Sequence, residues 1–228
     1  MTDIIQEKRL AAERSLEYVR DGMCLGLGSG STAAIMLGLL GRRVREGLRV
    51  RGVPTSEMSR ELAEREGIPI VGFDRVSRLD LTIDGADEVD GRGRLIKGGG
   101  GALLMEKVVA YASGRFVVVV DRGKLSDRLG SLFPVPIEVV PGALAPVRRA
   151  LQALGAEVGL RMAVRKAGPV VTDLGNLLLD ARFRTAFDPS AIEAALDAIP
   201  GVLGNGLFTR RRPEVLAAGP GGIETLKF

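Results

Sequence analysis

The stretch LTIDGADEVDGRGRLIKGGGGALLMEK combines four charged side chains of interest with four consecutive glycines. Asp84 and Asp87 precede the glycines, Lys97 adjoins them, and Glu106 follows them. Carboxylates can accept and return protons, whereas a lysine and closely spaced glycine amides can stabilise an oxyanion. These residue types at this spacing predict proton-transfer chemistry on a substrate that becomes negatively charged.

Simpler interpretations of the same residues remain open at this point. The segment DGADEVDG could be a solvated acidic turn, but it fits a calcium loop poorly because Ala86 stands where such a loop needs an oxygen ligand. Glu106 and Lys107 could be ordinary surface charges, since adjacent helical side chains are rotated by about 100°. A site is favoured because Asp84 follows an apolar strand, and open α/β sheets bind ligands at the carboxyl ends of their strands.

A second glycine-rich segment, GLGSGST at residues 26–32, lies between an apolar run and a helical pattern. Its N–H groups would point outward at a helix N-terminus, which is an arrangement that binds anions. A dinucleotide site would need a glycine in place of Ser31 and an acidic residue near Arg49 or Arg51, and a nucleoside-triphosphate loop would need a lysine. A phosphate or sugar-hydroxyl site and a plain strand-to-helix turn remain as interpretations.

The residue types that the chain lacks limit its chemistry. It has no histidine and a single cysteine, Cys24, which lies in an apolar run and is expected to be buried. Acid–base catalysis must therefore use carboxylates, lysine or tyrosine. Neither a zinc site nor an internal disulfide is expected.

The charge pattern favours a small anionic ligand over a nucleic acid. The 32 basic residues are scattered among 28 acidic ones, so the net charge of +4 marks no nucleic-acid surface. Only six basic residues are lysines, and Lys8, Lys97 and Lys124 occur where they could meet at the carboxyl edge of a sheet. Without signal-peptide features or a membrane-spanning run, a cytoplasmic protein with no membrane partner is expected.

The spacing of apolar residues predicts an α/β fold. Strands are predicted near residues 23–27, 50–53, 79–84 and 115–121. Helices are predicted over residues 4–20 and between the strands; one begins at Ser31 or Thr32, and another places Glu106 about two turns after its start. This alternation is typical of βαβ units and predicts a Rossmann-like, mostly parallel sheet.

The pattern changes near residue 128. Short strands, a hairpin over VTDLGNLLLD, and two helices follow, one of them capped by Asp188 with Pro189 in its first turn. This order predicts a second, smaller α+β domain at residues 129–204. The segment EVLAAGPGGIETL predicts one further strand that returns to the first domain, which is expected to comprise residues 1–128 plus 205–228.

Taken in order, the motifs GLGSGSTAA, TIDGADEVDG, IKGGGGALLMEKV, VTDLGNLLLD and IPGVLGNGLF resemble ribose-5-phosphate isomerases of the A type over nearly the whole chain. The resemblance implies a Rossmann-like domain with a smaller α+β domain, a homodimer or dimer of dimers, and no metal or nucleotide cofactor. It implies reversible conversion of ribose 5-phosphate to ribulose 5-phosphate through an enediolate, within the non-oxidative pentose phosphate pathway.

The resemblance also implies roles for individual residues. Glu106 matches the proton acceptor, Lys97 would stabilise the oxyanion, and Asp84 and Asp87 would handle hydroxyl protons. The expected substrate contacts come from both glycine loops, the acidic turn and two lysines: Ser29, Gly30, Ser31, Thr32, Gly85, Ala86, Gly98, Gly99, Gly100, Lys124 and Lys8.

Two other classes of protein are compatible with such a fold. A sugar-phosphate sensor would bind the ligand without turnover, although no helix-turn-helix segment accompanies this sequence. An acyl or CoA transferase would use Glu106 as a nucleophile and form a covalent thioester, but the DGAD and KGGG motifs argue against it.

Overall fold

The computed structural model describes residues 4–165 and 167–228. Contacts within the chain divide it into two compact units. The first comprises Met1–Ala86, Met105–Lys124 and Arg212–Phe228, and the second comprises Asp87–Leu104 and Leu125–Arg211. This division differs from the expected domain boundaries mainly in residues 87–104, which group with the second unit. The expected boundaries, as limits of independently folding domains, stay a prediction.

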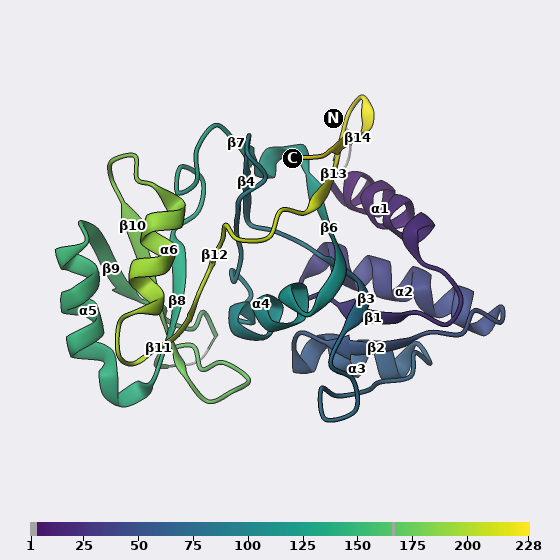
Figure 1. Cartoon of the computed structure of the whole chain (residues 1–228), viewed down its shortest axis with the longest axis horizontal. Coiled ribbons are helices and arrows are strands. Elements are labelled where there is room, and N and C mark those ends of the chain that lie inside the picture. Colours follow the sequence, from purple (N-terminus) through teal and green to yellow (C-terminus); the bar gives the residue numbers. More distant parts are fainter. Residues whose placement is uncertain (1–3, 166) are drawn as a thin grey trace. The chain divides into compact units, whose positions relative to one another are not determined.

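The first unit contains a mostly parallel sheet, so the predicted α/β fold class is confirmed. The strand order is β14-β13-β6-β3-β1-β2 (Figure 1). The strands are β1 (Cys24–Leu27), β2 (Arg51–Pro54), β3 (Leu79–Asp84), β6 (Ser113–Asp121), β13 (Glu214–Gly219) and β14 (Gly222–Leu226). Neighbouring strands are parallel except for β13 and β14, which are antiparallel.

Helices cover both faces of this sheet because side chains alternate along each strand. The helices are α1 (Ile4–Ser15), α2 (Ser31–Arg45), α3 (Glu57–Arg65) and α4 (Leu103–Tyr111). Leu25 and Leu27 of β1 share a core with α1, α2 and α3. Cys24, on the opposite face, packs with Val109 of α4. Burial raises the pKa of the Cys24 thiol, which agrees with the predicted core position.

The second unit contains an antiparallel sheet with the order β11-β8-β10-β9. These strands are β8 (Val135–Val139), β9 (Ala156–Leu160), β10 (Leu177–Phe183) and β11 (Val202–Asn205). The helices α5 (Leu144–Ala153) and α6 (Pro189–Asp197) contribute Val147, Leu151 and Leu196 to its core. The side chain of Asp188 accepts a hydrogen bond from the Ser190 amide, as expected for the cap of α6. The predicted α+β character is therefore confirmed.

A further small sheet, which the sequence did not predict, lies within the second unit. Its order is β12-β5-β4-β7, and its strands are β4 (Glu88–Asp90), β5 (Leu95–Ile96), β7 (Leu125–Ser126) and β12 (Leu207–Phe208). Strands this short show no periodicity that could be recognised in a sequence. The sheet matters because β4 directly follows Asp87 and β5 directly precedes Lys97.

The C-terminal segment adds to the sheet of the first unit, as predicted, but it does so as a hairpin of two strands and not as one strand. β13 pairs with β6, and β14 then turns back along β13. The turn is possible because Gly222 has a φ of 103°, a left-handed conformation that favours glycine. Among the residues that the structure describes, no helix is long and apolar enough to cross a membrane.

Candidate active site

Asp84 is the last residue of β3 and holds the first glycine loop. Its buried carboxylate oxygen Oδ1 accepts hydrogen bonds from the amides of Ser29, at 3.0 Å, and Gly85, at 2.8 Å. A Cβ atom at residue 28 would lie 2.3 Å from the same oxygen and 2.5 Å from the Asp84 Cα. Gly28 therefore allows the loop after β1 to approach the end of β3 this closely.

The hydroxyl of Ser29 joins this loop to the segment after β2. Its Oγ lies 2.6 Å from the Oγ1 of Thr55 and donates to the Oγ of Ser56 at 2.7 Å. Ser56 is also the N-cap of α3, where it accepts from the Ser59 amide. Sequence reasoning did not include Thr55 and Ser56 in the site. The capping pattern TSEMS, which follows a strand at the same edge of the sheet, is the signal that could have found them.

The start of α2 brings Lys8 to the first glycine loop. Gly30, at a φ of 94°, occupies the N-cap position, and within the described residues no side chain caps this helix. The helix begins at Ser31, as predicted, but its N-cap is the glycine before it and not a hydroxyl side chain. The Oγ of Ser31 accepts a hydrogen bond from the Nζ of Lys8 at 2.9 Å. An ammonium group and helix N-terminal amides thus lie together, an arrangement that suits an anion.

Glu106 and Lys124 belong to the same unit. Glu106 is buried, with 6% of its surface exposed, and lies in the first turn of α4. The expected position two turns into the helix was wrong because Gly101, at a φ of 87°, forms a turn and α4 begins only at Leu103. Lys124 is half-buried at the end of a short 3₁₀ helix, Arg122–Lys124, which follows β6.

In the second unit, Asp87 contacts the second glycine loop. Its Oδ2 accepts a hydrogen bond from the Gly99 amide at 2.7 Å. A Cβ atom at residue 99 would lie 2.5 Å from Oδ1 of Asp87, so any larger residue there would displace this carboxylate. The structure therefore joins two elements that the sequence predicted to act together, the acidic turn and the lysine–glycine loop.

Lys97 is among the largest fully buried side chains of the described chain, with 1% of its surface exposed. Its amide donates to the carbonyl of Gly206 at 2.9 Å, which fixes the backbone directly before the glycines. Its Nζ lies 5.8 Å from the centroid of the Phe208 ring, within the range of a cation–π interaction. A charge held in this way is unusual for a lysine with no functional role.

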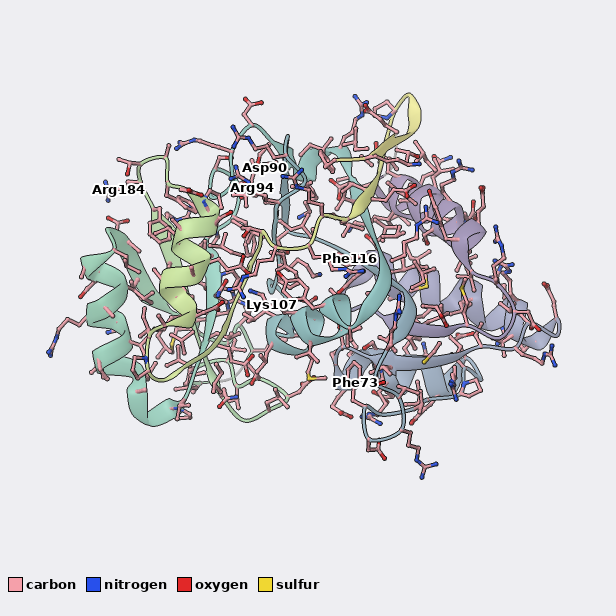
Figure 2. All side chains as sticks on the ribbon, viewed as in Figure 1. Phe73, Asp90, Arg94, Lys107, Phe116 and Arg184 are labelled. Carbon is pink, nitrogen blue, oxygen red and sulfur yellow. The ribbon has the colours of Figure 1, made fainter. Side chains whose placement is uncertain are left out.

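Two other acidic residues of the same stretch support the backbone. Glu88 is fully buried, and its carboxylate accepts hydrogen bonds from the amides of residues 130–133 and from the Ser131 hydroxyl, at 2.8 to 3.2 Å. Asp90 accepts from the amides of Arg92 and Arg94 and forms an ion pair with the Arg94 side chain at 2.6 Å (Figure 2). Their oxygens are therefore engaged in holding turns.

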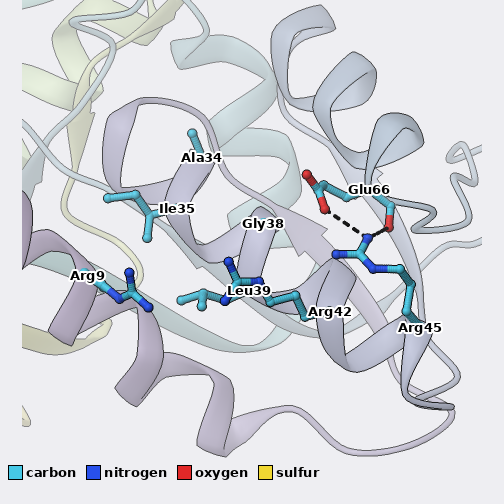
Figure 3. A pocket seen from close by; sticks show the side chains of 8 residues that line it. All are labelled: Arg9, Ala34, Ile35, Gly38, Leu39, Arg42, Arg45 and Glu66. Atoms are coloured by element: carbon cyan, nitrogen blue, oxygen red, sulfur yellow. Dashed lines mark hydrogen bonds and ion pairs between the residues drawn. The ribbon is translucent and has the colours of Figure 1, made fainter.

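A surface pocket of about 250 Å³ lies on the first unit, lined by residues of α1, α2 and the end of α3 (Figure 3). Its lining includes Arg9, Arg42 and Arg45 but none of the predicted site residues. Arg45 donates to the carboxylate and the carbonyl of Glu66 at 3.1 and 3.2 Å, and Arg9 pairs with Glu13 at 2.9 Å. Arg9 and Arg45 are thus partly neutralised by neighbouring carboxylates.

The predicted residues form two sets, each within one unit. Lys8, Ser29 to Thr32, Asp84, Gly85, Ala86, Glu106 and Lys124 belong to the first, and hydrogen bonds join Lys8 to Ser31 and Ser29 to Asp84. Asp87, Lys97 and Gly98 to Gly100 belong to the second. Across residues 4–165 and 167–228, no group of three or more histidine, cysteine, aspartate or glutamate side chains is placed to hold a metal.

Comparison with known proteins gives consistent results. The family of ribose 5-phosphate isomerase A (phosphoriboisomerase A) matches residues 51–222. A ribose-5-phosphate isomerase A of Thermosynechococcus vestitus is 53% identical over 89% of this chain and 87% of its own length. One of Thermococcus kodakarensis is 44% identical over 99% of both chains.

Solved structures extend the similarity to the fold. A ribose 5-phosphate isomerase A of Methanocaldococcus jannaschii superposes with a TM-score of 0.95 at 43% identity, covering 99% of this chain and 100% of its own. A D-ribose-5-phosphate isomerase in complex with phospho-erythronic acid has a TM-score of 0.96 at 42% identity and covers 100% of both chains. On this evidence, the chain belongs to the ribose 5-phosphate isomerase A family.

Proposed function

We propose that the chain interconverts ribose 5-phosphate and ribulose 5-phosphate through an enediolate, without a metal or a nucleotide, as in the non-oxidative pentose phosphate pathway. The observation that carries this proposal is the match over the whole chain to an isomerase solved with phospho-erythronic acid. That compound is a four-carbon sugar acid phosphate, and its two carboxylate oxygens resemble those of the enediolate. The relative therefore binds a molecule shaped like the intermediate proposed here.

Glu106 is the proposed base. It removes the proton from C2 of the open-chain aldose, which leaves the enediolate, and it returns the proton to C1 to give the ketose. Its burial supports this role, because a carboxylate shielded from water is a stronger base towards a bound substrate. The same buried side chain could in principle attack an acyl group, so covalent chemistry on Glu106 is the alternative to be tested.

Lys97 and the amides of the second glycine loop are proposed to stabilise the negative oxygen of the enediolate. Such preorganised donors typically contribute several kcal/mol in enzymes. The buried ammonium of Lys97 and the contact between Asp87 and Gly99 support this assignment. Asp84 and Asp87 are proposed to move hydroxyl protons. They assist ring opening, and they transfer the proton from O2 to O1 that must accompany the transfer from C2 to C1.

The first glycine loop is proposed to bind the phosphate and the sugar hydroxyls. The hydrogen bond from Lys8 to Ser31 and the uncapped start of α2 support a phosphate position there, with Lys124 as a further cation.

The test is an assay of the purified chain with ribose 5-phosphate, a chelator and no nucleotide. Enzyme-dependent formation of ribulose 5-phosphate is the expected result. Binding of the sugar phosphate without any ketose would favour the sensor. Capture of a thioester on Glu106 after incubation with an acyl-CoA would favour the transferase.

We also propose a homo-oligomer in the cytoplasm. Support for self-association comes from Met162, Val164, Val171 and Leu174, which are exposed by 57%, 97%, 49% and 51% within one short segment of the second unit. Exposed apolar side chains gathered in this way often mark a protein interface. The cytoplasmic location stays a prediction, and cell fractionation tests it.

A further inference from the structure

The second glycine loop needs support from outside itself. Gly98 and Gly101 have φ values of 100° and 87°, and the Gly101 amide donates to the Gly98 carbonyl at 3.0 Å. Glycine loses more conformational freedom on ordering than any other residue, so such a run is held in one conformation only if other groups restrain it. The structure shows which groups do so.

Arg161, which directly follows β9, contacts this loop. Its Nη1 donates to the carbonyl of Gly98 at 2.9 Å and to the carbonyl of Gly99 at 3.1 Å. Its Nε and Nη2 both bind the carboxylate of Asp180 on β10, with the Nε contact at 2.9 Å. The side chains are 14% and 27% exposed, so the guanidinium is largely shielded from water.

Arg161 is itself fixed by its backbone. Its amide donates to the carbonyl of Leu178 at 2.9 Å, and its carbonyl accepts from the amide of Val170 at 2.9 Å. Asp180 is held in the ladder between β9 and β10, opposite Gly159. The guanidinium thus binds the Asp180 carboxylate of the sheet and the carbonyls of the glycine loop at the same time. A lysine ammonium lacks the planar set of donors that these simultaneous contacts use.

The contacts determine the direction of two peptide groups. A trans peptide is planar, and its C=O and N–H point to opposite sides. The peptide that joins Gly98 to Gly99 is held at both ends, by Arg161 at its carbonyl and by Asp87 at its amide. The next peptide is held at the Gly99 carbonyl, so the N–H of Gly100, an exposed residue, must point away from Arg161.

We propose that Arg161, braced by Asp180, is a positioning residue that aims the Gly100 amide at the oxyanion of the enediolate. This inference rests on the proposed isomerase function, and it concerns geometry more than charge. The ion pair with Asp180 neutralises most of the long-range field of the guanidinium. Arg161 acts through the loop and does not touch the substrate.

The experiment compares Arg161→Lys, Arg161→Ala and Asp180→Asn with the wild-type chain. Arg161→Lys keeps the charge and loses the fork, so kcat is expected to fall on the order of 10-fold with KM changed less than about 3-fold, since a donor used mainly in the transition state is displaced. In Arg161→Ala, kcat is expected to fall on the order of 100-fold, and added methylguanidinium is expected to restore part of it. Asp180→Asn keeps the shape of the side chain that braces Arg161, so its kcat is expected to fall less than that of either Arg161 variant.

A matched control is Arg184→Ala. Arg184 (Figure 2) follows β10 in the same unit and forms an exposed ion pair with Glu157, where the two side chains are 77% and 55% exposed. The kcat of Arg184→Ala is expected to stay at the wild-type value and not to respond to methylguanidinium. Amide hydrogen exchange provides a readout besides activity: the Gly99 and Gly101 amides are expected to exchange faster in Arg161→Lys than in the wild type or the control.

The experiment distinguishes failure of the proposed function from failure of the positioning role of Arg161. Absence of turnover in the wild-type chain would overturn the proposed function. Turnover in the wild type, together with an unchanged kcat and unchanged exchange in folded Arg161→Lys, would overturn the positioning role alone. A rise in KM with kcat intact would also overturn it, because the loop would then serve ground-state binding. If Arg161→Ala does not fold, Arg161→Lys and Asp180→Asn decide the question.

Discussion

The position of the Asp84 carboxylate depends on the absence of a side chain at residue 28. The Cβ of an alanine there would lie 2.5 Å from the Asp84 backbone, which cannot move away as a flexible side chain could. We expect Gly28→Ala to lower the free energy of unfolding by about 1–3 kcal/mol, as overpacking commonly does, and to reduce kcat as Asp84 shifts.

Gly38→Ala is the control, because nothing lies within 4 Å of a Cβ at this position in α2. It is expected to raise the free energy of unfolding by about 0.5–1 kcal/mol through helix propensity. Urea unfolding and steady-state kinetics measure both effects. Equal stability of the two variants would show that the loop after β1 accommodates a methyl group.

Replacing the single residue Glu106 by Gln tests its proposed role as the base. The amide preserves the size and shape of the side chain but cannot accept the C2 proton, so kcat is expected to fall about 10²- to 10⁴-fold. Thermal unfolding and binding of a sugar phosphate should be close to those of the wild type. Glu61→Gln, at an exposed position on α3, should retain full activity. Near-native turnover in a folded Glu106→Gln variant would remove Glu106 from the mechanism.

At the scale of elements, Glu88 connects β4 to the segment 130–133. Backbone amides can only donate, so a glutamine side chain would place an amide donor against at least one of them. We expect Glu88→Gln to lower the free energy of unfolding by about 1.5–3 kcal/mol, the range for hydrogen bonds to charged groups. Glu13→Gln, which loses an exposed pair with Arg9, should cost less than about 1 kcal/mol. Equal losses measured by urea unfolding would mean that the segment does not depend on Glu88.

Long elements could be predicted from the sequence, whereas short connections could not. The apolar run of β6 and the cap at Asp188 each carry a local signal, and both elements are where they were expected. Strands such as β5 and β12, each of two residues, depend on pairing with residues far along the chain. The same reason explains Arg161, whose partners Gly98 and Gly99 are more than 60 residues away in sequence. The residue types of the candidate site were visible, but their supporting contacts were not.

At the scale of the whole molecule, the dependence of stability on pH is expected to be flat near neutrality. The chain has no histidine, so no side chain has an ordinary pKa near 6.5. Burial acts to raise the pKa of Glu214, but hydrogen bonds from Tyr18 and Arg115 outweigh it and the net pKa is lowered. The pKa of Tyr18 is raised, first by burial and then by its bond to Glu214.

The directions of these two pKa shifts define an acidic and an alkaline limit to the stability that the pair contributes. A lowered carboxyl pKa gives stability that is present above the ordinary value of 4.5 and is lost as the pH falls through the lower folded value. A raised tyrosine pKa gives stability that is present below 10.0 and is lost as the pH rises through the higher folded value. Glu214→Gln should therefore reduce stability at pH 7 by about 1 kcal/mol or less, because Arg115 is half exposed, and by less at pH 3. An equal effect at both pH values, measured by urea unfolding, would contradict this linkage.

Self-association is the other property of the whole molecule that can be tested. Val164→Asp places a charge on the most exposed apolar side chain of the segment 161–176 and should shift sedimentation towards a smaller species. Met58→Asp is the control, because Met58 is 58% exposed on α3 of the other unit. An unchanged sedimentation coefficient for Val164→Asp would place the interface elsewhere.

The strand order has a consequence for synthesis on the ribosome. β13 lies between β6 and β14, yet residues 122–213 must be translated after β6 before β13 begins. At typical elongation rates this takes on the order of ten seconds. During that time β6, with its valines at 117–120, has one unpaired edge in the nascent chain. Translation that slows within residues 122–213 should therefore lengthen the exposure of this edge and increase aggregation or chaperone binding.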